Sequence, residues 1–282
     1  MLVGGVGNQL FGYFAALAFK DVRKETLIID LSEIPKGMTK HGSSIESFIL
    51  EPDLKFKRKP LVPFIISSTI RKLFRYMGLL NEFKPNEVGF IEDLFKIKQK
   101  RVLGYFQTWR YFDLLSTRSK TQNLTLKNPS SWYTSKAEIA LKERPIMIHI
   151  RRGDYLELQE SIGVLKDSYF VNALGKLPKE YRKRKIWLFT DSEKSIDGIL
   201  SDHAFTDAEI VMPPRDTDPA ESLMLMTFAS ANIISNSTFS WWGAFLNNDD
   251  GPVVAPKKWF KGLNDPQDLI PPSWILCESE WL

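Results

Sequence analysis

Residues Pro145–Tyr155, PIMIHIRRGDY, decide the fold predicted for this chain. Residues 146–150 form a short apolar run with β-branched side chains, which is typical of a buried strand in a parallel sheet. The polar residues RRGD (151–154) follow at once, and ligands of open α/β sheets bind beyond the carboxyl ends of strands. A guanidinium matches phosphate oxygens two at a time. The stretch therefore predicts either an anion site at the mouth of a crevice or a surface loop with a solvated Arg–Asp pair.

The composition of the 282 residues fits packed domains, since 43% are hydrophobic and 12% aromatic, which excludes a disordered chain. The net charge of +4 suits an anionic small molecule or a membrane surface and is too weak to indicate nucleic-acid binding. The single cysteine, Cys277, excludes an intrachain disulfide and fits a reducing compartment. No apolar run of about 18 residues or more and no signal peptide are found. We therefore expect a cytoplasmic protein.

Apolar runs alternate with helical patterns along the chain, which indicates two α/β domains. A polar stretch at residues 121–136 reads as a linker, so we expect an N-terminal domain at 1–130 and a C-terminal domain at 131–282. The expected helices are residues 10–24, 135–143, 167–177 and 221–230. Besides the strand at residues 146–150, the expected strands are residues 26–30, 186–190, 210–212 and 233–235.

Two stretches of the first domain carry polar side chains suited to a ligand. Residues 4–9, GGVGNQ, precede a helix, and a helix start attracts an anion or a sugar hydroxyl. Asn8 could serve there as a cap or as a ligand, while the glycines could equally serve tight strand–helix packing. Residues 102–112, VLGYFQTWRYF, predict a strand and an aromatic loop, which fits either a sugar site or core packing.

A basic region lies between residues 43 and 100, including 55–59 and the amphipathic run RKLFRY at 71–76. It fits a peripheral contact with a membrane surface or the solvated face of an ordinary helix. The sequence favours the second interpretation.

Two further expected strand ends in the second domain carry polar groups. Asp191 follows the strand 186–190 and could accept hydrogen bonds from a base or a ribose. Ser237, Thr238 and Phe239 open a helix whose N–H groups could hold a phosphate. Trp241 and Trp242 in the same helix are expected in the core. Strand ends that converge on one crevice strengthen the prediction of a binding site.

The segments GGVGNQLFGY, GYFQTWRYF, HIRRGDY, LFTDS and ISNSTFSWWGAFL, in this order, resemble the α-1,2-fucosyltransferases of glycosyltransferase family eleven. The resemblance implies a GT-B fold of two Rossmann-like domains facing a central cleft. It also implies GDP-fucose as donor, inversion at the fucose anomeric carbon, and neither metal nor cofactor. The acceptor would be the 2-hydroxyl of a terminal β-galactose, in a surface polysaccharide, a lipopolysaccharide O-antigen or a lipid-linked oligosaccharide.

The same resemblance implies roles for individual residues. Arg151 would bind the donor diphosphate, Asp191 would meet the guanine or ribose, and Asn8 would lie near the reacting sugar. The expected catalytic residues are Arg151, Asn8 and Asp154, and the expected donor-binding residues are His149, Arg151, Arg152, Asp191, Ser237, Thr238 and Phe239. The general base stays open among Asp154, Glu157 and His149, and a dissociative route would need none.

Three observations keep other interpretations in view. Family members commonly have a longer first strand than this chain, which suggests a truncated start. Asp216 and Asp218 have the Asp-x-Asp spacing of metal-dependent GT-A glycosyltransferases, although the proline after Asp218 favours a helix cap instead. The aromatic residues also suit a non-catalytic glycan-binding protein, which leaves the paired arginines unexplained.

Overall fold

The computed structural model describes residues 2, 4–26, 28–31, 44–52, 54–57, 77, 82–85, 88–98, 101–115, 124–247 and 249–282. The chain divides into two compact units. Unit 1 consists of Met1–Lys127 and Pro266–Leu269, and unit 2 of Asn128–Asp265 and Ile270–Leu282. The basic run at 71–76 lies outside the described residues. Among those described, no helix combines the length and the apolar character needed to cross a membrane.

Unit 2 is built on a six-stranded sheet in which every pair is parallel, in the order β12-β11-β10-β7-β8-β9. The strands are β7 (Ile146–Ile150), β8 (Ile186–Thr190), β9 (Glu209–Ile210), β10 (Ala231–Ile233), β11 (Val253–Pro256) and β12 (Ile275–Cys277). All five residues of β7 are buried, as expected for the centre of a parallel sheet. This sheet confirms the expected α/β class.

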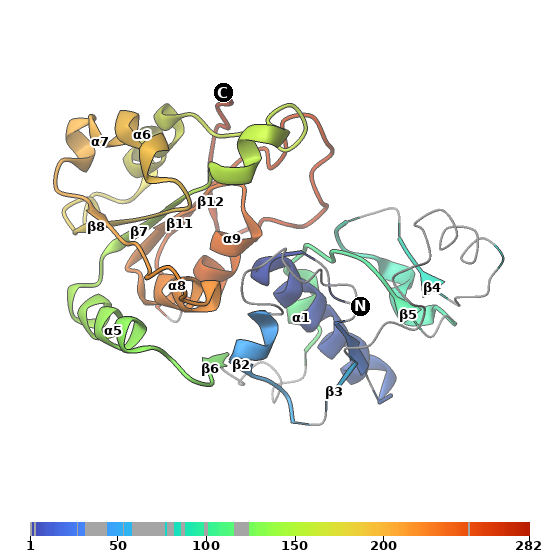
Figure 1. Cartoon of the computed structure of the whole chain (residues 1–282). Helices are drawn as coiled ribbons and strands as arrows, with labels where there is room; N and C mark the ends of the chain where they lie inside the picture. The colour runs from blue at the N-terminus through green and yellow to red at the C-terminus, as the bar shows by residue number, and fades with distance from the viewer. Residues whose placement is uncertain are drawn as a thin grey trace. The chain divides into compact units, whose positions relative to one another are not determined.

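Helices cover both faces of this sheet (Figure 1). They are α5 (Ser131–Glu143), α6 (Asp167–Lys176), α7 (Asp197–Leu200), α8 (Pro219–Leu225) and α9 (Thr238–Phe245). Because side chains alternate along a strand, Ile146, Ile148 and Ile150 pack with α6 and α7, whereas Met147 packs with α5 and α8. The carboxyl ends of six parallel strands thus share one edge of the sheet.

Short 3-10 helices complete unit 2: η3 (Gly153–Leu158), η4 (Glu193–Ser195), η5 (His203–Phe205) and η6 (Met226–Phe228). The linker expected at 121–136 is wrong in its second half, because α5 already begins at Ser131. Ser130 caps that helix by accepting a hydrogen bond from the Tyr133 N–H, 3.2 Å from its hydroxyl oxygen. Trp241 and Trp242 are buried, which confirms their expected place in the core.

Unit 1 contains α1 (Val6–Arg23), which starts four residues earlier than expected, and two parallel strand pairs. β1 (Ile28–Asp30) pairs with β3 (Lys55–Lys57), and β4 (Glu82–Phe83) pairs with β5 (Arg101–Val102). β2 (Phe48–Ile49) pairs with β6 (Thr125–Leu126) in antiparallel fashion. The remaining described elements are η1 (Ser44–Ser47), η2 (Glu92–Lys96) and α3 (Arg110–Asp113).

Candidate active site

Arg151 directly follows β7, and its guanidinium is held from three sides. Nη2 donates to Asp154 Oδ1 at 2.6 Å, and Nη1 lies 3.0 Å from Asp191 Oδ2. The guanidinium carbon lies 5.3 Å from the centre of the Tyr155 ring, a cation–π distance. The side chain is 29% exposed, and its Nε is buried without a hydrogen-bond partner. Arg151 is therefore a fixed cation that remains accessible at the strand end.

Asp191 follows the neighbouring strand β8 and braces the turn after β7. Its Oδ1 accepts hydrogen bonds from the backbone N–H groups of Arg152 (2.9 Å) and Gly153 (3.2 Å). A Cβ at position 153 would lie 2.4 Å from Asp191 Oδ2, so this close approach requires glycine. The sequence suggested that Asp191 meets the guanine or ribose, which stays a prediction. Its contacts with Arg151 and with the turn after β7 hold the Arg151 guanidinium in place.

Arg152 is placed differently from the expectation that it contacts the donor. Its side chain is 3% exposed and points into unit 2, where it donates to the Leu165 carbonyl and to Asp167 Oδ1 (2.5 Å). Burial lowers the pKa of Arg152, and Asp167 opposes that shift. The turn at Gly153 thus separates the two arginines into an accessible one and an internal one. Arg152 thus anchors the backbone after β7 inside unit 2.

His149 lies inside the sheet, with its Nδ1 3.1 Å from the hydroxyl oxygen of Ser235 and its ring 5.1 Å from that of Phe239. Burial, together with the smaller effect of the nearby positive charge of Arg151, lowers the pKa of His149 to about 3. An imidazole with this pKa is neutral at physiological pH and is a weak base. His149 is therefore poorly suited to be the general base, which leaves the exposed Asp154 and Glu157.

The start of α9 is connected to Arg151 through Tyr155. Ser237 precedes the helix with no hydrogen bond from its side chain to the helix, and α9 begins at Thr238. The Tyr155 hydroxyl donates to the Asn236 carbonyl at 3.3 Å and also bonds the Ser237 side chain. Burial raises the pKa of Tyr155 to about 12.

Reasoning from sequence missed Tyr155. The signal was an aromatic residue directly after the polar turn, as the last letter of the opening stretch.

The arrangement in unit 2 can therefore hold an anion. A guanidinium matches the oxygens of a phosphate, and the N–H groups of a helix start attract the same charge. Ser237, Thr238 and Phe239 lie at that helix start, as the sequence suggested. Tyr155 contacts both the Arg151 guanidinium and the carbonyl of Asn236, two residues before α9, so it links the guanidinium to the segment that leads into the helix.

Asp218 caps α8, which confirms the helix-cap interpretation of the Asp-x-Asp spacing. Its Oδ1 accepts from the Ala220 N–H at 2.8 Å, and Pro219 is the first helical residue. No cluster of three or more His, Cys, Asp or Glu residues with metal-ligating geometry occurs among the described positions.

Asn8 belongs to unit 1, where it lies in the first turn of α1. Its Oδ1 accepts a hydrogen bond of 2.9 Å from Gln107 Nε2, and Asn8 is partly exposed. In the aromatic stretch that contains Gln107, Phe106 and Tyr111 are buried and pack against each other, whereas Tyr105 is exposed. Core packing thus accounts for Phe106 and Tyr111, while the amide of Gln107 faces Asn8.

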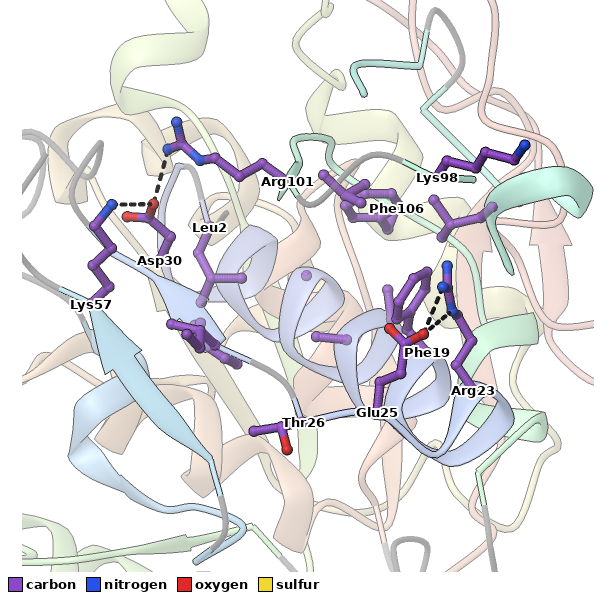
Figure 2. Close-up of a pocket in the computed structure, with 17 residues that line it drawn as sticks. Leu2, Phe19, Arg23, Glu25, Thr26, Asp30, Lys57, Lys98, Arg101 and Phe106 are labelled. Carbon is purple, nitrogen blue, oxygen red and sulfur yellow. Dashed lines mark hydrogen bonds and ion pairs between the residues drawn. The ribbon is translucent and has the colours of Figure 1, made fainter. Parts of the chain in front are cut away.

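Unit 1 also contains a cavity of about 590 Å³ between α1, β1 and β5. Figure 2 shows Arg101 and Lys57 reaching Asp30 at one end and Arg23 paired with Glu25 at the other. None of the residues expected in the active site lines it.

Comparison with known proteins gives a family match and several relatives. The model of glycosyl transferase family 11 matches residues 133–278, just over half of the chain. The α-1,2-colitosyltransferase of Escherichia coli is 25% identical over 99% of this chain and 98% of its own length. The O-antigen biosynthesis glycosyltransferase WbnK of Escherichia coli is 27% identical over 97% of this chain and 98% of its own length. The galactoside α-(1,2)-fucosyltransferase 1 of Mus musculus is 23% identical over 70% of this chain and 55% of its own length.

Proposed function

The chain belongs to glycosyl transferase family 11, and we propose that it transfers L-fucose from GDP-β-L-fucose to the 2-hydroxyl of a terminal β-galactose, with inversion. The observation that carries this proposal is the placement of Arg151 beyond β7, fixed by Asp154 and Asp191. When the fucosyl bond breaks, negative charge builds on the departing GDP. A preorganised guanidinium stabilises that charge more in the transition state than in the ground state.

Donor binding would change the partners of Arg151 without moving its backbone. Asp154 is 62% exposed and so can give way to a phosphate, whereas Asp191 is tied to the turn by two further hydrogen bonds. Asp154, once released, is a carboxylate next to the reacting groups. We therefore include it, with Glu157, as a candidate general base for the acceptor hydroxyl.

A second donor deserves a direct comparison, because one relative is an α-1,2-colitosyltransferase. Colitose is the 3-deoxy analogue of fucose, so the two donors differ in one hydroxyl group. A site that hydrogen-bonds this hydroxyl would reject the deoxy sugar strongly, whereas an apolar site would discriminate weakly.

The proposed biological setting follows from the relatives and from the charge. Because WbnK is an O-antigen biosynthesis glycosyltransferase, we propose an O-antigen or other surface-glycan acceptor, carried on a lipid-linked oligosaccharide. The enzyme would act in the cytoplasm, with its net charge of +4 supporting a peripheral contact with the inner face of the membrane. No metal is required in this scheme, because Arg151 takes the charge-stabilising role.

The test is a transfer assay with purified protein, each of the two GDP-sugars, and a panel of β-galactosides, followed by linkage analysis of the product. An α-1,2-linked fucosyl product, formed equally well in EDTA, supports the proposal. If the protein uses GDP-colitose in preference to GDP-fucose, colitose replaces fucose as the proposed donor sugar. Activity that disappears in EDTA and returns with manganese would favour the metal-dependent alternative, and the absence of both transfer and GDP-sugar hydrolysis would favour a glycan-binding protein.

A further inference from the structure

Two stretches that the sequence marks separately in unit 1 meet at one hydrogen bond. Asn8 lies in the glycine-rich start of α1, and Gln107 lies 99 positions later in the aromatic stretch. Their side-chain amides join through Gln107 Nε2 and Asn8 Oδ1, which are 2.9 Å apart. An amide–amide contact between such distant segments suggests that one amide orients the other.

Gln107 is the fixed member of the pair. It is 7% exposed, and its backbone N–H donates to the Val88 carbonyl at 2.7 Å. The preceding residue, Phe106, has a φ of 51°, a left-handed conformation that is unfavourable for a bulky side chain. The Thr108 N–H bonds the Phe106 carbonyl across this turn at 2.9 Å. The strained turn thereby holds the side chain of Gln107 against Asn8.

Asn8 is the accessible member. Because its Oδ1 accepts from Gln107, its Nδ2 keeps two hydrogens to donate. Gly4 stands beside this Nδ2 with a φ of +73°, and a Cβ there would lie 2.7 Å from the nitrogen. The first turn of α1 has neither an acidic residue nor a side-chain cap. The amide donor and the helix start therefore favour the same kind of ligand atom, an oxygen.

We propose that Gln107 is a positioning residue, which fixes the Asn8 amide so that Nδ2 donates to an oxygen of the glycosyl substrate. That oxygen belongs to a sugar hydroxyl or to a phosphate, and Gln107 itself makes no substrate contact. The proposal rests on the proposed function for its substrate class. The proposal predicts that substitutions of Gln107 change sugar transfer only through their effect on Asn8.

A double-mutant cycle tests this dependence. Gln107→Met removes the donor at nearly constant volume, and we expect kcat/KM to fall about tenfold or more, because misplacing a substrate-positioning group costs up to about a hundredfold. In an Asn8→Ala background the same change should alter kcat/KM by less than about twofold. Separate KM values for the GDP-sugar and the glycan show which of them supplies the oxygen.

Gln107→Glu provides a second variant with a specific expectation. A carboxylate only accepts hydrogen bonds, so the Asn8 amide would have to turn and present Oδ1 to the substrate instead of Nδ2. We expect it to impair transfer at least as much as Gln107→Met. The matched control is Thr108→Val, which removes the hydroxyl that donates to the Asp268 carbonyl at 2.8 Å. Thr108→Val should lower the melting temperature. Any effect that it has on kcat/KM should add independently to the effect of Asn8→Ala.

A readout without substrate separates this proposal from the proposed function. In 15N NMR spectra the Asn8 side-chain amide is assigned by its absence in Asn8→Ala, and Gln107→Met should shift it toward the position of a solvated amide. An unchanged Asn8 signal, additive effects in the cycle, or near-native transfer by either Asn8→Ala or Gln107→Met would overturn the positioning role. Wild-type protein that fails to transfer any sugar, yet shows the NMR shift, would count against the proposed function alone.

Discussion

At the scale of single residues, the two consecutive arginines after β7 have opposite environments. Arg151 is held at the surface by Asp154 and Asp191, whereas Arg152 is buried against Leu165 and Asp167. The sequence shows both as identical side chains at a strand end, and alternation along a strand predicts only that they diverge. Which of them faces solvent depends on the turn at Gly153, and that turn is set by the tertiary contact with Asp191.

Arg151→Ala should lower kcat more than it raises the donor KM, because its charge acts mainly in the transition state. Loss of one such contact typically costs on the order of a hundredfold in rate. Arg151→Lys should restore only part of it, since an ammonium lacks the two-pronged geometry. The measurement is steady-state kinetics, with the exposed Arg184→Ala in the same unit as the control. A folded Arg151→Ala protein with native turnover would contradict the mechanism.

Arg152→Ala should act on stability rather than on the chemical step, because it leaves polar partners without their buried cation. We expect a loss of a few kcal/mol in the free energy of unfolding, measured by urea denaturation.

His149 should make stability depend on pH. Its pKa of about 3 in the folded protein lies below the ordinary value of 6.5. Between these two values the unfolded chain binds a proton that the folded protein does not, so stability is complete above about pH 6.5 and falls as the pH drops toward 3. The slope from this group is at most about 1.4 kcal/mol per pH unit.

His149→Asn tests this dependence, because an amide can keep the bond to Ser235 without titrating. Urea unfolding at several pH values should show a shallower loss of stability below pH 6.5 in the variant. The acidic groups contribute equally to both proteins, so equal slopes would rule out His149 as a source of the pH dependence.

At the scale of elements, the sequence predicts best where an apolar run ends sharply. β7 and β8 match their predicted strands residue for residue, because each run is followed at once by a charged residue, Arg151 or Asp191. β10 begins two residues earlier than predicted, because Ala231 and Asn232 pair with β7 although neither is typical of a strand. The start of α5 was missed for a tertiary reason, since Glu221 of α8 binds both the N–H and the hydroxyl of Ser130.

The turn after β7 gives the element-scale prediction. Gly153→Ala places a Cβ where Asp191 now packs, so Asp191 must shift and release Arg151. Transfer activity should fall by about tenfold or more, while the Tm changes less than in Arg152→Ala. The matched control is Gly175→Ala in α6, where an added Cβ meets nothing within 4 Å. Gly175→Ala should be neutral or stabilise the protein by up to about 1 kcal/mol. An equal loss of activity in both variants would argue against the role of Asp191 in holding Arg151.

At the scale of the whole molecule, the residues expected to bind the donor nucleotide all belong to unit 2, whereas Asn8 and Gln107 belong to unit 1. The sequence predicted two α/β domains from alternating strands and helices. It did not predict that residues 266–269 return to unit 1, where the Asp268 carbonyl binds Thr108. That contact joins segments 160 positions apart, and no local pattern encodes it.

Because the residues expected to bind the donor nucleotide all belong to unit 2, nucleotides should change its thermal unfolding. A ligand that binds only the native state at a hundred times its Kd stabilises it by about 2.7 kcal/mol, which for a unit of this size is a rise in Tm of roughly 5 to 10 °C. GDP should produce such a rise, because under the proposed function Arg151 and the start of α9 would meet its phosphates. ADP and UDP share those phosphates, so any smaller effect with them measures recognition of the guanine.

Arg151→Ala should reduce the shift in Tm with all three nucleotides, and Arg184→Ala should keep it. Equal shifts for GDP, ADP and UDP in the wild-type protein would remove guanine recognition from the proposal, while leaving Arg151 as a diphosphate site.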